Sequence, residues 1–134
     1  MGYTTLSTAA TLIINLGHAA TAATTVTTAW AKTGSVTMDA AVHTNEQWWT
    51  DGLVTVRSVG SAGTVFGQGR FETAAQAFTS AQWVNSFMAS AGQATPATAT
   101  VDMTINEFLV LSAKWSLTTA YSITGHTYAL EALN

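Results

Sequence analysis

Three histidines are the first candidates for chemistry in this sequence, because histidine transfers protons near neutral pH and is a common metal ligand. They are His18, His43 and His126, which lie far apart along the chain and in three different contexts. Metal sites of the cupin type need closely spaced His and Glu residues on one strand, and none of the three has that spacing. We therefore expect surface or hydrogen-bonded histidines, and the sequence predicts neither a metal site nor a cofactor.

Carboxylates are the second candidates, since two of them a few ångströms apart could hydrolyse a glycosidic bond. Glu72 has a plainer use as an ion-pair partner of Arg70 on its own strand or of Arg57 on the neighbouring one. No Gly-x-Ser-x-Gly elbow is present, and Gly67-Gln68-Gly69 lacks the third glycine of a nucleotide-binding loop. We therefore do not expect an enzyme. The carboxylates considered are Glu72, Asp102, Glu107 and Glu131.

Aromatic side chains carry the remaining functional signal, because exposed rings on a β-sandwich commonly stack on sugars or fill subunit interfaces. Trp48 and Trp49 are adjacent, so on a strand one can enter the core while the other meets solvent or a neighbouring subunit. The alternative is that both rings are buried between two layers. Core filling is expected to account for at least three of the five tryptophans. The candidate interface residues are Trp30, Trp48, Trp49, Tyr121 and Tyr128.

The charge content is the most informative feature of the composition. Charged residues make up 8% of the 134 residues and apolar residues 48%, whereas a charged share of about 25% is typical of soluble domains. A free monomer normally uses charge to remain soluble, so a surface of small neutral residues suggests cover by identical subunits or a larger assembly. The alternative is a secreted monomer with a neutral, threonine-rich face.

The same composition disfavours several classes of partner. The net charge is −3, and the few strong cations form no basic patch, so nucleic-acid binding is not expected. No apolar run reaches the ~18 residues of a membrane span, and the start of the chain lacks the features of a secretion signal, so no membrane contact is expected. The sequence contains no cysteine, which leaves packing and association as the sources of stability.

The clearest local structure lies between Leu53 and Glu72. β-Branched residues dominate positions 53–59, a turn composition occupies 60–63, and the strand signal resumes at 64–66, which together predict a β-hairpin. Asp51-Gly52 would supply a bend before it, and both faces of its first strand are expected to be at least half covered. Glycines in the returning strand indicate a bulge, a bend or a close backbone approach, so we expect that strand to curve. The residues that define the hairpin are Arg57, Gly60, Gly63, Gly67 and Gly69.

Further strand signals recur about every ten residues. The segments 12–14, 24–31, 35–41 and 107–117 are predicted strands, a short strand is expected near Trp83, and the apolar end at 121–133 is expected to pair into a sheet. Strict alternation from 97 to 105 predicts one buried face that includes Ala99, Val101 and Ile105. The chain is therefore predicted to be one all-β domain over residues 1–134, an antiparallel, jelly-roll-like β-sandwich of about eight to ten short strands.

Four segments follow one another in a recognisable order from Leu53 to the end of the chain. They are VTVRSVGSAGTVFGQG, TATVDMT at Thr98–Thr104, L-x-A-x-W at Leu111–Trp115, and the ending YSITGHTYALEALN. In this order they resemble a hairpin, two strands and a closing strand in the C-terminal part of jelly-roll structural proteins of tailed bacteriophages. Met103 and Lys114 depart mildly from that pattern.

The resemblance implies a non-enzymatic virion protein that is assembled in the host cytoplasm. The expected role is a capsid decoration or minor capsid protein, and the expected partners are identical subunits in a homotrimer and the major capsid protein or other virion proteins. The alternative is a receptor- or glycan-binding tip domain of a phage fibre or spike, whose partner is a host surface glycan. The first role places Trp48 or Trp49 in protein interfaces, whereas the second needs an exposed aromatic platform beside Asp, Asn or Gln.

Overall fold

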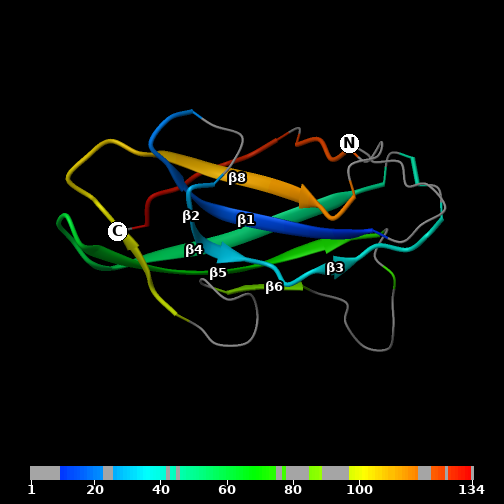
Figure 1. The fold of residues 1–134 in the computed structure, drawn as a ribbon, viewed down its shortest axis with the longest axis horizontal. Coiled ribbons are helices and arrows are strands. Elements are labelled where there is room, and N and C mark those ends of the chain that lie inside the picture. Colours follow the sequence, from blue (N-terminus) through cyan, green and yellow to red (C-terminus); the bar gives the residue numbers. More distant parts are fainter. Residues whose placement is uncertain are drawn as a thin grey trace.

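The computed structural model describes residues 10–22, 26–41, 43–44, 46–74, 77, 85–88, 97–117, 122–125 and 127–133 (Figure 1). This part of the chain is all-β and contains eight strands and no helix. The strands are β1 (Thr11–Ala19), β2 (Thr28–Lys32), β3 (Val36–Thr37), β4 (Trp48–Ser58), β5 (Gly63–Thr73), β6 (Asn85–Met88), β7 (Ala99–Val101) and β8 (Phe108–Trp115).

Two long strands organise the fold, and each pairs with one long strand on one side and two short strands on the other. β1 pairs with β8 along one edge and with β2 and β3 along the other. β5 pairs with β4 along one edge and with β6 and β7 along the other. A bridge between Lys32 of β2 and Met88 of β6 connects the two groups. All pairs are antiparallel, and the long strands β4 and β8 each keep one edge free of the other described strands.

The two groups pack face to face, and the core lies between them. Leu12 and Ile14 share one face of β1 because side chains alternate along a strand, and Phe71 of β5 meets them from the opposite layer. This arrangement confirms the predicted antiparallel β-sandwich, whereas its jelly-roll connectivity stays a prediction. The larger buried cluster consists of Leu12, Ile14, Ala31, Val36, Met38 and Phe71, and the smaller one of Val65, Ala99 and Val101.

The predicted hairpin is confirmed and is longer than expected. β4 and β5 pair along their full lengths, with one irregularity of register near the turn. Gly60 in the turn has a φ of 104°, in the left-handed region that glycine enters without steric cost. Its carbonyl accepts hydrogen bonds from the amides of Gly63 and Met103, both at 3.1 Å. The predicted bend at Asp51-Gly52 is wrong, because both residues continue the β4 ladder opposite Arg70 and Gly69.

Gly67 and Gly69 lie where the backbone of β5 is approached closely by other strands. A Cβ atom at Gly69 would lie 2.2 Å from the carbonyl oxygen of Asp51, and one at Gly67 would lie 2.8 Å from the carbonyl oxygen of Trp30. Of the three reasons predicted for these glycines, close backbone approach therefore applies. It lets β4 and β2 contact β5 without a side chain between them.

The burial of β4 differs from the prediction that both of its faces are at least half covered. Leu53 and Val56, which point to opposite faces of β4, are both exposed, and so is Val59 just after the strand. The reason is the position of β4 at the edge of the sheet, where it has one neighbouring strand among the described residues. The sequence pattern of a β-branched strand does not distinguish an edge from a centre.

The alternating segment 97–105 forms a shorter strand than predicted. Ala99 and Val101 are buried as expected, but β7 ends at Val101 and Ile105 is exposed. The cause is a local turn, in which Asp102 Oδ1 accepts hydrogen bonds from the backbone amide of Thr104 at 2.9 Å and from its hydroxyl at 2.6 Å. Such Asp-centred turns compete with strand pairing.

Three other predicted strands also differ in detail. β8 confirms the strand within 107–117, although Val110 is buried on it while Leu109 and Leu111 are exposed. The strand near Trp83 corresponds to β6, whereas Trp83 itself lies outside the described residues. The end of the chain does not form the expected strand, because residues 122–125 and 127–133 belong to no sheet.

Candidate functional site

Trp48 and Trp49 face opposite sides of β4, as their adjacency predicts. Trp48 packs against the larger core cluster, and its ring centroid lies 6.1 Å from that of Phe71. Its Nε1–H donates a hydrogen bond of 3.2 Å to the carbonyl of Thr124. Trp49 is 41% exposed on the outer face of the sheet. The alternative in which both rings are buried is therefore wrong for the chain by itself.

Trp49 forms one wall of a shallow groove on the outer face of the β4–β5 hairpin. The groove has a volume of about 240 Å³ and is lined by Gln47, Trp49, Glu72, Thr73 and Ala74. The register places Trp49 directly opposite Glu72, so an aromatic ring and a carboxylate stand side by side. An apolar ring face beside polar side chains is an arrangement that suits a polar ligand with an apolar face.

Arg70 contacts the Trp49 ring. Its guanidinium carbon lies 4.3 Å from the ring centroid, within the range of a cation–π contact. Its Nε–H also donates a 2.8 Å hydrogen bond to Oδ1 of Asp51, the residue opposite it on β4. Arg70 is thus paired with Asp51 rather than with Glu72, which corrects the expected ion pair. Because Trp49, Asp51, Arg70 and Glu72 share one face, the hairpin register alone assembles this group.

The other predicted site residues lie in different surroundings. Trp30 packs against the smaller core cluster and meets the His18 ring edge to face, with centroids 5.6 Å apart. Arg57 is exposed near the end of β4. Tyr128 is exposed in the C-terminal segment, and Tyr121 lies outside the described residues. Trp30 therefore fills space between strands, and Trp49 and Tyr128 are the aromatic candidates with accessible rings.

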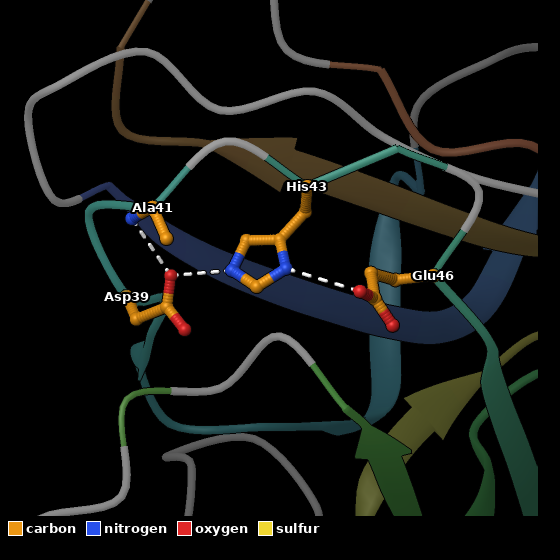
Figure 2. Close-up of polar contacts among 4 residues, drawn as sticks. All are labelled: Asp39, Ala41, His43 and Glu46. Carbon is orange, nitrogen blue, oxygen red and sulfur yellow. Dashed lines mark hydrogen bonds and ion pairs between the residues drawn. The ribbon is translucent and has the colours of Figure 1, made fainter.

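His43 forms a clasp with two carboxylates in the loop between β3 and β4. Its Nε2 contacts Oδ1 of Asp39, and its Nδ1 lies 3.3 Å from Oε1 of Glu46, as Figure 2 shows. Asp39 Oδ1 also accepts a 2.9 Å hydrogen bond from the amide of Ala41. The clasp closes the loop that leads the chain into β4 and the two tryptophans.

The clasp shifts the pKa values of its members in opposite directions. Partial burial by itself lowers the pKa of His43, but the hydrogen bonds and charges of Asp39 and Glu46 outweigh it, so the pKa of His43 is raised. Partial burial by itself raises the pKa of Asp39, but the hydrogen bonds from His43 and Ala41 and the charge of His43 outweigh it, so the pKa of Asp39 is lowered. The folded chain therefore favours the imidazolium form of His43 and the carboxylate form of Asp39.

The remaining titratable candidates are spread over separate elements. His18 is buried on β1, and His126 lies outside the described residues. Glu72 is on β5, Asp102 in the turn after β7, and Glu107 just before β8. Within the described part of the chain, no group of three His, Cys, Asp or Glu side chains has the arrangement of a metal site.

Comparisons with known proteins identify no relative. No family model matches the sequence, and neither a curated protein nor a solved structure matches the chain. Among the described residues, no helix is long and apolar enough to cross a membrane.

Sequence reasoning missed two features of the site. Asp39 and Glu46 stand four residues before and three residues after His43, but this spacing indicates proximity only in a helix, and the segment is a loop. The groove was missed because the hairpin was predicted to begin at Leu53. Extending the ladder back to Trp48 would have placed Trp49 opposite Glu72.

Proposed function

We propose that the chain is a non-enzymatic virion structural protein of a tailed bacteriophage, acting as a capsid decoration or minor capsid protein. The resemblance from Leu53 to the end of the chain supports the phage assignment. Exposed apolar side chains on β4 and β8, the two long strands that each have an edge unpaired by any other described strand, support the structural role. These side chains are Leu53 and Val56 on β4 and Phe108, Leu109 and Leu111 on β8.

The exposed apolar side chains support an assembly. Leu53 and Val56 on β4 and Leu109 and Leu111 on β8 are 44% to 54% exposed. Exposed apolar side chains along sheet edges suit a subunit that is completed by its neighbours.

The mechanism of such a protein is burial rather than catalysis. Neutral, threonine-rich faces and apolar edges would be covered by identical subunits in a homotrimer and by the major capsid protein or other virion proteins. The low charge content suits this role, because few ions must be stripped of water when the surfaces meet. No cofactor, nucleic acid or membrane is assigned to the chain.

Mass measurements test the proposal in two stages. Light scattering of the purified protein at several concentrations should give a constant multiple of 14.0 kDa. Mass spectrometry of purified phage particles whose genome encodes the chain should then find its peptides in the virion. A single-chain mass at every concentration, or absence of the peptides from the particles, overturns the structural role.

A glycan-binding tip domain is a second candidate, favoured by the Trp49 groove. The exposed ring can stack on the apolar face of a sugar, while Glu72 and Gln47 offer polar groups to its hydroxyls. This is the aromatic platform with a neighbouring amide that the alternative role requires. The groove is open and shallow, as expected for a surface that holds one or two sugar units rather than a buried ligand.

A glycan array with matched variants tests the second candidate. Trp49→Ala should weaken binding of any captured glycan about tenfold, equivalent to about 1.4 kcal/mol. Leu53→Ala is the control, because Leu53 is exposed on the same face of β4 but does not line the groove. Equal binding by both variants, or no binding by the unmodified protein, would exclude the groove as a sugar site.

A further inference from the structure

The end of the chain carries apolar side chains that its own sandwich leaves uncovered. We call residues 127–133 the C-terminal arm. Tyr128 is 95% exposed, Leu130 74% and Leu133 76%, and the arm has a single charged residue, Glu131. Three large apolar side chains in one short exposed segment indicate a surface that is buried in a complex.

The arm begins at a fixed point of the sandwich. Just before it, Ile123 packs against the larger core cluster and the carbonyl of Thr124 accepts the hydrogen bond from Trp48. A Cβ atom added at Gly125 would lie 3.9 Å from the ring of Trp48. From this anchor the chain runs along the long axis of the molecule, toward the end that carries the β4–β5 turn (Figure 1). The arm therefore starts from an ordered attachment and runs along the sandwich (Figure 1).

The matching surface is the edge of β8 with which no other described strand pairs, called here the free edge of β8. Leu109 and Leu111 lie opposite His18 and Leu16 of β1 and point toward the space between the layers, yet both are exposed. Leu111 also lines a cavity of about 180 Å³ whose other walls include Ile14, Trp48 and Ile123. The side of the sandwich between β8 and the start of β4 thus has an apolar opening that residues 123–125 cover only in part.

We propose that the C-terminal arm of one copy lies along the free edge of β8 in a second copy and covers Leu109 and Leu111 there. The inference rests on the homo-oligomer of the proposed function and names the contact that forms it. The arm has seven residues and β8 has eight, so one can follow the other along almost its full length. An extended segment added to a sheet edge satisfies the free backbone groups of that edge.

Two observations favour a second copy as the partner. The arm and the β8 edge are both apolar and nearly uncharged, so the same chain supplies both complementary surfaces. Within one chain, Leu109 and Leu111 stay exposed and so do the three large side chains of the arm, so the arm does not cover the β8 edge of its own sandwich. When each copy donates one arm and receives one about a rotation axis, the exchange closes into a symmetric oligomer.

Disulfide trapping tests which chain the arm reaches. The sequence has no cysteine, so introduced cysteines are the only thiols. A chain that carries Leu130→Cys on the arm is mixed with a chain that carries Leu109→Cys or Leu111→Cys on β8, and the mixture is oxidised. A tag on one of the two chains makes it larger than the other. Because a disulfide requires Cα atoms within about 7 Å, the expected product is a linked pair of tagged and untagged chains. Val59→Cys replaces the β8 cysteine as the control, since Val59 at the β4–β5 turn is more exposed than either β8 position and a random encounter would link it at least as readily.

Two trapping results would overturn the arm exchange. One is that Leu130→Cys forms no more disulfide with Leu109→Cys or with Leu111→Cys than it forms with the Val59→Cys control. The other comes from a chain that carries both Leu111→Cys and Leu130→Cys: oxidation to a linked single chain would show that the arm closes its own sandwich.

Light scattering separates failure of the arm exchange from failure of the proposed function. Replacing Tyr128, Leu130 and Leu133 by serine should reduce the mass to that of one chain. Serine at the exposed residues Val59 and Ile105 should leave the mass unchanged. An unmodified protein that is already a single chain overturns the homo-oligomer itself. An unmodified oligomer whose mass survives the arm substitutions overturns only the arm exchange.

Discussion

Trp48 and Trp49 are consecutive residues of β4, yet their rings have opposite roles. Trp48 packs on Phe71 with ring centroids 6.1 Å apart, whereas Trp49 lies on the outer face beneath the guanidinium of Arg70, 4.3 Å from it. The inner ring joins the two layers and anchors the C-terminal segment through Thr124. The ring of Trp49 lines a groove on the outer face of the hairpin instead of packing in the core.

The two tryptophans should therefore differ in their effect on stability. Trp48→Ala removes core contacts and the hydrogen bond to Thr124, and should lower the free energy of unfolding by about 3 kcal/mol. Trp49→Ala should lower it by less than about 1 kcal/mol, because the ring is exposed and its contact with Arg70 is weak in water. Urea unfolding at one protein concentration measures both. Equal losses for the two variants would contradict the assigned orientations.

Gly69 should not tolerate a side chain. A Cβ atom there would lie 2.2 Å from the carbonyl oxygen of Asp51, so the β4 and β5 backbones would have to separate. Gly69→Ala should cost about 2 to 3 kcal/mol in unfolding free energy. Gly125→Ala is the control, because its Cβ would meet only the Trp48 ring at 3.9 Å and should change stability by less than about 0.5 kcal/mol. Thermal unfolding of the two variants side by side provides the comparison.

Thr33 should stabilise the fold through its hydroxyl group rather than through its volume. It is buried, and its Oγ1 accepts a 3.0 Å hydrogen bond from the amide of Ile14 in the middle of β1. Thr33→Val keeps the volume but leaves that buried amide without its acceptor, which should cost about 1 to 3 kcal/mol. Thr33→Ser keeps the acceptor and loses a methyl group. A serine variant less stable than the valine variant would show that packing, not the hydrogen bond, makes Thr33 important.

Local patterns in the sequence specify the hairpin and β8 but not the surroundings of either strand. The turn at Gly60 depends on residues next to one another, so composition reveals it. The exposure of Leu53 and Leu109 depends on which strands lie at the sheet edges, and that is decided by pairings between distant segments. The strand signal at 97–105 also failed for a local reason, because the Asp102 side chain satisfies the backbone of Thr104 and ends β7.

The candidate site was predictable to a similar extent. The opposite orientation of Trp48 and Trp49 follows from the two-residue period of a strand. The partners of Trp49 do not, because the contact with Arg70 requires the register of β4 against β5. The clasp around His43 could not be predicted for a different reason. The loop conformation that brings Asp39 and Glu46 together follows no periodic pattern in the sequence.

The clasp gives stability a specific dependence on pH. The pKa of His43 is raised in the folded chain, so its contribution is complete below the ordinary value of 6.5 and is lost as pH rises through the folded value. The pKa of Asp39 is lowered, so its contribution is complete above the ordinary value of 3.8 and is lost as pH falls through the folded value. The clasp therefore stabilises most between these two values.

Substitution of His43 isolates this effect from the other titrating groups. His43→Gln should destabilise the protein by up to about 1 kcal/mol near pH 5, a modest amount because Asp39 and Glu46 are partly exposed to solvent. The deficit should shrink as the pH rises from 6.5 through the raised folded pKa of His43, where the imidazolium of the unmodified chain loses its proton and its ionic contacts. Urea unfolding of both proteins from pH 4 to pH 9, at one protein concentration, gives the difference directly. A difference that stays constant over this range would mean that His43 acts through packing of the loop and not through its charge.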